Sequence, residues 1–135
     1  MIVIVIDASS LAKYVLREEN WKEVRNYLLE ESRSLSLALA EVSNAIWKHC
    51  VLYGRISREQ ASKMFKALDK LKDVVSFEPF QKYLENAVNI AMDNKITVYD
   101  ALYIAQAMET GKLLTSDDRQ KSVADNLGID VIFID

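Results

Sequence analysis

An uninterrupted run of β-branched residues at positions 2–6, Ile-Val-Ile-Val-Ile, is the segment that most constrains the fold of this chain. A strand with one face in water alternates apolar and polar residues, whereas a strand covered on both faces is apolar throughout. Positions 2–6 are therefore predicted to form a central strand of a parallel sheet. The run has no basic lead and ends at Asp7, so it is too short for a signal peptide or a membrane span.

The rest of the chain alternates between short apolar segments and stretches with helical periodicity. Strands are predicted at about 35–39, 74–77, 112–115 and 131–134, and helices at about 9–17, 21–31, 40–53, 57–72, 79–94 and 98–110, with a last short helix before the final strand. Asn20 is a predicted N-cap, and Ser57 with Gln60 forms a capping-box pattern. Strands joined by helical crossovers indicate an α/β fold, a three-layer α/β/α sandwich whose central sheet of four to five strands is mainly parallel.

Length and charge limit the classes of protein to which the chain can belong. Its 135 residues, of which 50% are hydrophobic, fit one compact domain. The 20 acidic and 17 basic residues give a net charge of −3, which offers no overall attraction for nucleic acid or for an anionic membrane. Cys50 is the only cysteine, so no intramolecular disulfide can form and the reducing cytoplasm is the expected location.

Four acidic residues are predicted to meet at one edge of the sheet: Asp7, Glu41, Asp100 and Asp117. Three of them follow predicted strands, and the carboxyl ends of parallel strands share an edge. Asp100 begins a helix that feeds the strand at 112–115 through a turn at Gly111, so its helix should start at the same edge. Taken singly, each acid could be an ordinary helix-capping residue.

The environment of Asp100 argues against a purely structural role. Its helix is predicted to be largely buried, and it contains no lysine or arginine to balance the carboxylate. Several carboxylates in one place repel one another, and a divalent cation relieves that repulsion. Oxygen ligands alone favour Mg²⁺ or Mn²⁺ over Zn²⁺. Because such ions bridge phosphate oxygens and activate water, phosphodiester hydrolysis is the predicted chemistry, with either one ion or two.

Four segments of the chain resemble, in order, the sequence blocks of PIN-domain ribonucleases, in particular the VapC-type toxins: IVIDASSLAKY, LALAEVSNAIWK, TVYDALYIAQA and LLTSDD. The resemblance spans the whole chain and implies a single PIN domain over residues 1–135. It also implies an endoribonuclease that holds Mg²⁺ or Mn²⁺ through the four acids, which fall on the family's acidic positions. Ser9 and Thr115 match hydroxyl residues of the family and are expected to orient carboxylates or water. Asp118 lies beside Asp117, and the sequence leaves open which of the two faces the metal.

The same resemblance implies partners. VapC-type proteins usually form homodimers and are silenced by a small antitoxin whose tail enters the acidic cleft, so a homodimer, an antitoxin and an RNA substrate are all expected. Exposed aromatic residues would suit the dimer surface: Trp47, Tyr53 and Phe65. Three basic residues near strand ends or early helix turns are candidates for contacts with RNA phosphates: Lys13, Arg17 and Arg119.

Two alternative functions use a similar arrangement of acids. A catalytically inactive PIN-like module would bind RNA or an antitoxin without turnover. A small phosphatase or phosphoreceiver would also gather acids at strand ends, but Ser9 stands where a haloacid-dehalogenase-type phosphatase needs its second Asp. His49 lies on the apolar stripe of its helix and is expected to be packed there rather than to act as a base or ligand.

Overall fold

A five-stranded sheet in the order β3-β2-β1-β4-β5 organises the computed structural model, which describes residues 2–135. All neighbouring strands are parallel. The strands are β1 (Ile4–Ile6), β2 (Ser32–Leu35), β3 (Val75–Glu78), β4 (Lys112–Thr115) and β5 (Asp130–Phe133). β1 is the middle strand and all of its residues are buried, which confirms the prediction from the β-branched run.

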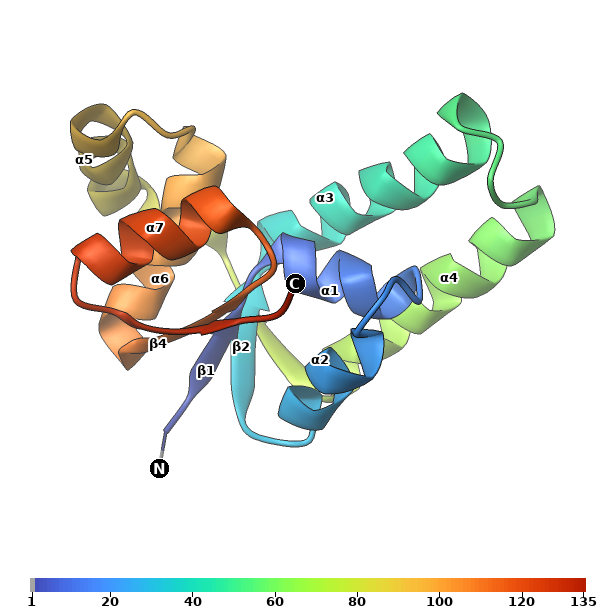
Figure 1. Cartoon of the computed structure of the whole chain (residues 1–135), viewed down its shortest axis with the longest axis horizontal. Helices are drawn as coiled ribbons and strands as arrows, with labels where there is room; N and C mark the ends of the chain where they lie inside the picture. The colour runs from blue at the N-terminus through green and yellow to red at the C-terminus, as the bar shows by residue number, and fades with distance from the viewer. Residues whose placement is uncertain (1) are drawn as a thin grey trace.

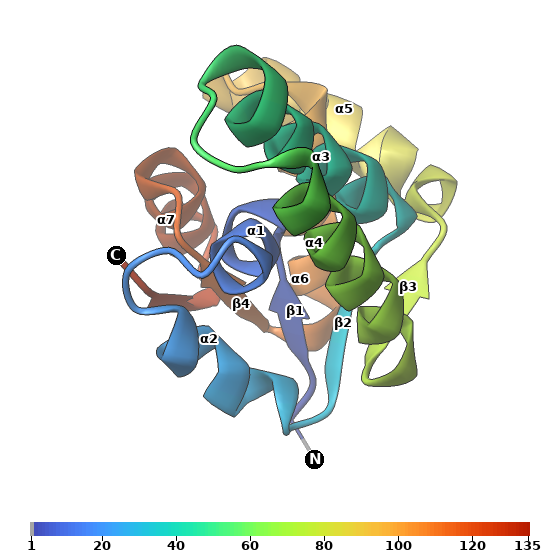
Figure 2. The same ribbon diagram turned by 90° about the vertical axis from the view of Figure 1, so that its right-hand side faces the viewer.

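Helices cover both faces of the sheet, so the predicted α/β sandwich is confirmed (Figure 1). The helices are α1 (Ala8–Val15), α2 (Trp21–Leu28), α3 (Ser36–Trp47), α4 (Arg58–Lys70), α5 (Leu84–Asn94), α6 (Val98–Thr110) and α7 (Asp118–Asn126). Figure 2 shows α1 to α4 in front of the sheet and α5 to α7 behind it. The strand order explains this division: the crossovers from β1 through β2 to β3 run one way across the sheet and those from β3 through β4 to β5 run the other way. Right-handed crossovers in opposite directions place their helices on opposite faces.

The prediction of a second strand at 35–39 is wrong. β2 ends at Leu35, and α3 begins at Ser36. Leucine and alanine in the run that follows favour a helix, while the strand accepts polar residues because Ser34 donates its hydroxyl to the carbonyl of Ile6 at 2.6 Å. As a result, Glu41 lies in the second turn of α3 rather than at the start of a helix.

Several helix ends also differ from the predictions. α1 and α2 end earlier than expected, and the helix predicted to start at 40 begins at Ser36 as α3 and continues beyond Trp47 as a π-helical turn, Lys48–Leu52. Pro79 is followed by a short 3₁₀ turn, Phe80–Tyr83, before α5 begins. Among residues 2–135, no helix has both the length and the apolar character that a bilayer crossing requires.

The two predicted helix caps have different outcomes. The capping box of Ser57 and Gln60 is present, with hydrogen bonds of 2.7 and 3.1 Å. Asn20 occupies the N-cap position of α2, but its side chain makes no capping hydrogen bond. It donates instead to the carbonyl of Asp135 at 2.7 Å, so the predicted N-cap position is confirmed, but the side chain joins the start of α2 to Asp135 and does not cap the helix.

Candidate active site

A pocket of about 240 Å³ lies at the carboxyl edge of the sheet and is lined by residues of α1, α3, α6 and α7, including the N-cap residues of α1 and α7. All four acids singled out in the sequence line it: Asp7, Glu41, Asp100 and Asp117. Asp118 is exposed and is not among the residues that line this pocket. Of the two adjacent acids, Asp117 is therefore the one that lines the pocket with Asp7, Glu41 and Asp100.

Asp7 is the most deeply placed of the four acids, at 2% exposure. It follows β1 directly and caps α1 by accepting a hydrogen bond from the amide of Ser10 at 3.1 Å. Ser9 donates its hydroxyl to Oδ1 at 2.6 Å, and Thr115 donates its hydroxyl to Oδ2. Burial raises the pKa of Asp7 to about 6; the three hydrogen bonds oppose that rise, and the nearby charge of Asp117 adds to it.

The two hydroxyl residues join Asp7 to the loop that carries Asp117. Besides donating to Asp7, Thr115 accepts from the amide of Asp117 at 3.1 Å, and Ser9 accepts from the amide of Ser116 at 2.9 Å. The segment after β4 is thereby fixed beside the segment after β1. This is an orienting arrangement, of the kind expected of these two residues, in which each hydroxyl fixes a carboxylate and a backbone amide at once.

Glu41 points from α3 toward α6, where Tyr103 donates its phenol to Oε1 at 2.6 Å. Burial raises the pKa of Glu41; the Tyr103 hydrogen bond opposes the rise and the charge of Asp100 adds to it. Burial, followed by the charge of Glu41, holds the pKa of Tyr103 well above its usual range, so Tyr103 stays a protonated donor. Sequence reasoning missed this residue, although its position one turn after Asp100 places the two side chains on one helix face.

Asp100 and Asp117 both lie at helix N-termini. Thr97 caps α6 by accepting from the amide of Asp100 at 3.1 Å. Burial raises the pKa of Asp100, as does the charge of Asp117, while the Thr97 hydrogen bond and the charge of Arg119 oppose that rise. Asp117 caps α7 by accepting from the amides of Arg119 and Gln120 at 2.8 and 3.0 Å. The side chain of Gln120 also lines the pocket, and sequence reasoning did not single it out.

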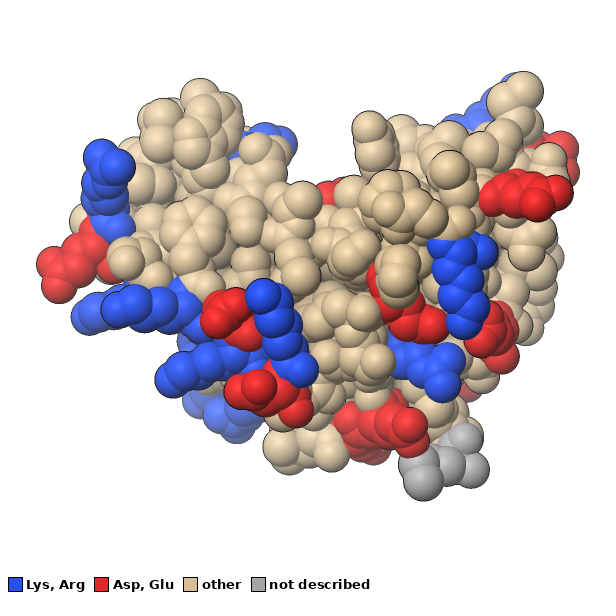
Figure 3. All heavy atoms as spheres, turned by 180° about the vertical axis from the view of Figure 1, so that it is seen from behind, with Lys and Arg blue, Asp and Glu red and all other residues tan. Residues whose placement is uncertain are grey.

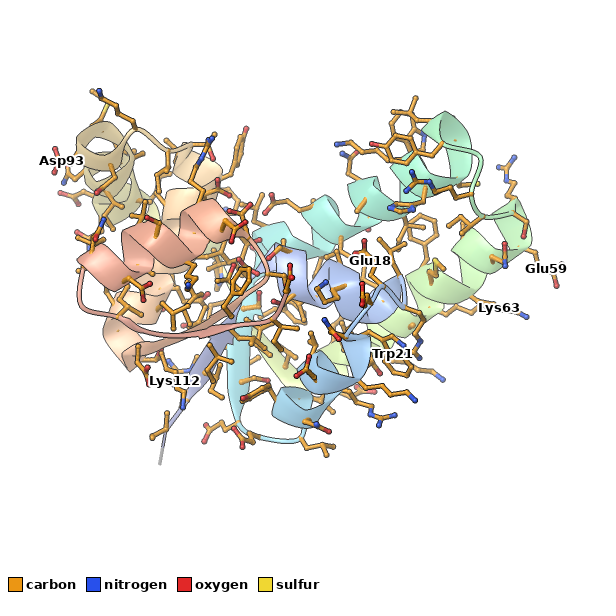
Figure 4. All side chains as sticks on the ribbon, viewed as in Figure 1. Glu18, Trp21, Glu59, Lys63, Asp93 and Lys112 are labelled. Carbon is orange, nitrogen blue, oxygen red and sulfur yellow. The ribbon has the colours of Figure 1, made fainter. Side chains whose placement is uncertain are left out.

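The predicted RNA-contacting residues are arranged differently from one another. Lys13 donates its ammonium to the carbonyl of Glu19 at 3.1 Å. The guanidinium of Arg17 lies 4.0 Å from the ring centroid of Trp21, which Figure 4 labels on α2. Arg119 is exposed at the start of α7, and its positive charge opposes the rise in the pKa of Asp100. Of the three, Arg119 is the one whose charge reaches the pocket.

The pocket suits a hydrated divalent cation. Within the described part of the chain, none of the side chains that line it belongs to a lysine or arginine, and three of its acids have raised pKa values. Across residues 2–135, however, no three Asp, Glu, His or Cys side chains converge closely enough to hold one ion among them. Mg²⁺ often takes one or two carboxylates and keeps several of its water molecules. The oxygen ligands present here fit an ion of that kind.

The sequence of the chain is similar to those of VapC proteins. It matches the PIN domain family over residues 4–126. It is 32% identical over 119 residues to ribonuclease VapC3 of Pyrobaculum aerophilum, covering 87% of this chain and 90% of that protein. It is 29% identical over 126 residues to exonuclease VapC9 of the same organism, covering 93% of this chain and 88% of that protein.

The fold is also similar to those of solved structures. PAE2754 from Pyrobaculum aerophilum superposes with a TM-score of 0.70 at 24% identity, covering 98% of this chain and 89% of the other. VapBC2 from Rickettsia felis, solved with a DNA fragment from its promoter, gives a TM-score of 0.66 at 14% identity, covering 98% of this chain and 99% of the other. With the family match, the sequence similarity and this arrangement of acids, the chain belongs to the PIN-domain family and is a member of its VapC type.

Proposed function

We propose that this protein is a single-domain VapC-type endoribonuclease that uses Mg²⁺ or Mn²⁺ bound at the acid pocket. The observation that carries the proposal is the meeting of four acids from separate elements in one pocket, where burial and mutual repulsion raise the pKa of three of them. A divalent cation is the ligand that would relieve both effects. The name of the relative ribonuclease VapC3 supports RNA as the substrate.

Each residue of the pocket has a proposed part in the reaction. Asp7, Glu41, Asp100 and Asp117 would hold the hydrated ion, some directly and others through its water molecules, and the ion would supply charge that polarises a phosphodiester and activates water. Ser9 and Thr115 fix the two oxygens of Asp7. Hydrolysis of this kind would leave a 5′-phosphate on one product and a 3′-hydroxyl on the other.

A second hollow suggests the route of the RNA strand. It has a volume of about 340 Å³, and it shares Glu41 and Ala45 with the acid pocket before it extends along α3 to Asn44 and Lys48. Figure 3, which shows the molecule from behind, has basic and acidic side chains interspersed over its lower part, so that face offers no uniform positive surface. We propose that the strand lies along α3, where Lys48 contacts a phosphate.

We also propose the partners expected of a VapC-type protein, a homodimer and an inhibitory antitoxin. Trp47 and Phe65 are 45% and 41% exposed and border a hollow of about 430 Å³ between the outer parts of α3 and α4. Exposed aromatic residues around a concavity are typical of association surfaces. This end of the α3–α4 pair is the proposed dimer contact.

Cleavage of labelled RNA by purified protein tests the proposed nuclease. In Mn²⁺, the wild type should cleave at internal sites, EDTA should stop cleavage, and D7N or D100N should lower the rate by at least about 100-fold. D118N is the matched control, because Asp118 neighbours Asp117 but is exposed and is not among the pocket-lining residues. Full activity of purified D7N, or loss of activity in D118N alone, would contradict the assignment of the site.

A further inference from the structure

Gln120 is a residue of the acid pocket, and its side-chain amide oxygen has no hydrogen-bond partner. The residue is 2% exposed and lines the acid pocket. Within residues 2–135, three buried side-chain oxygens have no hydrogen-bond partner, and they belong to Ser32, Gln106 and Gln120. Of these three residues, Gln120 is the one that lines the pocket. The unpartnered oxygen of Gln120 therefore belongs to a pocket residue, unlike those of Ser32 and Gln106.

The other buried residues of α7 are apolar. Val123 and Ala124, three and four residues further along α7, are buried apolar residues on the same helix face. An apolar side chain at 120 would continue that face, whereas a buried oxygen without a partner lowers the stability of the fold. The polar group is thus retained where packing alone would favour a methionine or a leucine.

The position of Gln120 is fixed with respect to the acids. Its backbone amide donates to Oδ1 of Asp117 at 3.0 Å, so the start of α7 carries Asp117 and Gln120 into the pocket as one unit. Since no three acids in the described chain converge on one ion, an ion held here would keep water molecules that need acceptors. A neutral amide can accept from such a water molecule without adding a fifth negative charge to the pocket.

We propose that Gln120 is a positioning residue of the metal site, whose amide oxygen accepts a hydrogen bond from a water molecule of the hydrated ion. This inference rests on the metal-dependent function proposed above. The ion would be held directly by carboxylates and indirectly by this amide. Gln120 would therefore contribute to the affinity for the ion although it is not an acid.

The two roles open to a buried glutamine predict opposite effects of Gln120→Met on stability. A residue that only packs should lose stability on substitution and leave ion binding unchanged. A residue whose oxygen accepts a hydrogen bond from a bound water molecule should behave in the opposite way. Q120M removes the oxygen at similar volume, so it should be at least as stable as the wild type in EDTA. It should also bind Mn²⁺ about 10-fold to 100-fold more weakly.

The experiment is calorimetric titration of the full chain with Mn²⁺, together with thermal unfolding in EDTA. Gln106→Met is the matched control, because Gln106 is also fully buried with an unpartnered oxygen, but its amide nitrogen donates to Ser34 and Glu78 at 2.8 and 3.0 Å, away from the pocket. Q106M should unfold at a lower temperature and bind Mn²⁺ as the wild type does. Gln120→Ala removes the amide oxygen without adding a charge, so it should bind Mn²⁺ about as weakly as Q120M.

Each outcome decides the proposal. Weak Mn²⁺ binding by Q120M with unchanged stability in EDTA supports it, and binding within twofold of the wild type overturns it while leaving the proposed nuclease intact. If Q120M does not fold, Q120A decides: Mn²⁺ binding weakened at least tenfold supports the proposal, and binding within twofold of the wild type overturns it. A wild-type protein that binds no Mn²⁺ overturns both the inference and the metal-dependent function.

Discussion

Asp7 combines features that do not occur together in an ordinary helix cap. It caps α1, yet it is buried, accepts two side-chain hydroxyls as well as an amide, and lies near another acid. A capping role needs only one acceptor and no burial. The extra donors make the ionised form tolerable inside the fold without supplying a positive charge. Burial of the Asp7 carboxylate lowers the stability of the fold, whereas ion binding needs that carboxylate in its ionised form.

The pH dependence of stability should reveal that conflict in metal-free protein. The pKa of Asp7 is raised from 3.8 to about 6 in the folded protein, so between these values the native state holds a proton that the unfolded chain has lost. The free energy of unfolding should then fall as the pH rises from about 4 to about 6 and stay lower above that. Asp7→Asn removes this fall and should be more stable at pH 7.5 by about 2–3 kcal/mol.

Urea denaturation of both proteins in EDTA at several pH values measures this difference. Glu41 and Asp100 also have raised pKa values, so the wild-type curve contains their contributions, and the difference between the two curves isolates Asp7. Curves that run parallel from pH 4 to 8 would show that Asp7 is not held as described.

Ion binding should depend on pH through the same residue. Carboxylates must lose their protons to bind a metal ion, so binding of Mn²⁺ below a pH of about 6 should release protons from Asp7. The affinity should weaken as the pH falls through that value. Calorimetric titrations in two buffers with different ionisation enthalpies count the protons released. Binding that is equally tight at pH 5 and pH 7.5 would disagree with this account.

At the scale of the helices, two caps of similar chemistry allow a matched comparison. Thr97 caps α6, which carries Asp100 into the pocket, while Ser57 caps α4 at a distance from it. Removing either side-chain acceptor should lower the free energy of unfolding by about 1 kcal/mol. Thr97→Ala should also slow RNA cleavage several-fold, because the first turn that positions Asp100 frays, whereas Ser57→Ala should cleave at the wild-type rate.

Urea denaturation and a cleavage assay on the same preparations test this comparison. Thr97→Ser keeps the acceptor and should restore both stability and rate. If Thr97→Ala and Ser57→Ala slow cleavage equally, the effect comes from general stability and not from the position of Asp100.

Most elements could be predicted from the sequence because their patterns are unambiguous. A continuous β-branched run is typical of a buried central strand, and the strand predicted at 112–115 has the same bounds as β4. β2 could not be placed because its stability is non-local: the strand has the sequence Ser-Arg-Ser-Leu, and Ser34 finds its partner on β1, while the neighbouring Leu-Ala run satisfies both helical and strand patterns. Leucine and alanine favour a helix in that run, but propensity is a weak signal beside the contacts that the strand makes with its neighbours.

The acids of the site were predictable for a different reason. In a parallel sheet, the position of a residue along its strand or helix already determines the edge at which it lies, so the error in β2 did not displace Glu41 from the pocket. Tyr103 and Gln120 were missed because their roles depend on which face of a helix packs inward. α6 is buried and apolar around most of its circumference, whereas α7 is mostly polar and buries only Gln120, Val123 and Ala124. A tyrosine in α6 looks like a core residue until its hydroxyl is seen to reach Glu41.

For the whole molecule, the exposed aromatic residues at the outer end of α3 and α4 predict association. Phe65→Glu places a charge at this surface and should convert a dimer into a monomer of 15.4 kDa. Met92→Glu is the control, because Met92 is 79% exposed on α5, on the opposite face of the sheet. Analytical ultracentrifugation of the three proteins measures their masses. A wild type that sediments as a monomer, or a dimer in Phe65→Glu, would remove this surface as the contact.

The parallel order of the strands has a consequence for how the protein is made. The pocket draws on residues from Asp7 to Gln120, and Asp7 is completed only when Thr115 arrives with β4 beside β1. A nascent chain on the ribosome has no assembled site until β4 and the start of α7 have emerged and docked. A nuclease that acts on RNA would thus stay inactive until β4 and the start of α7 have been translated and have folded against β1, and the ribosome that makes it would be spared until then.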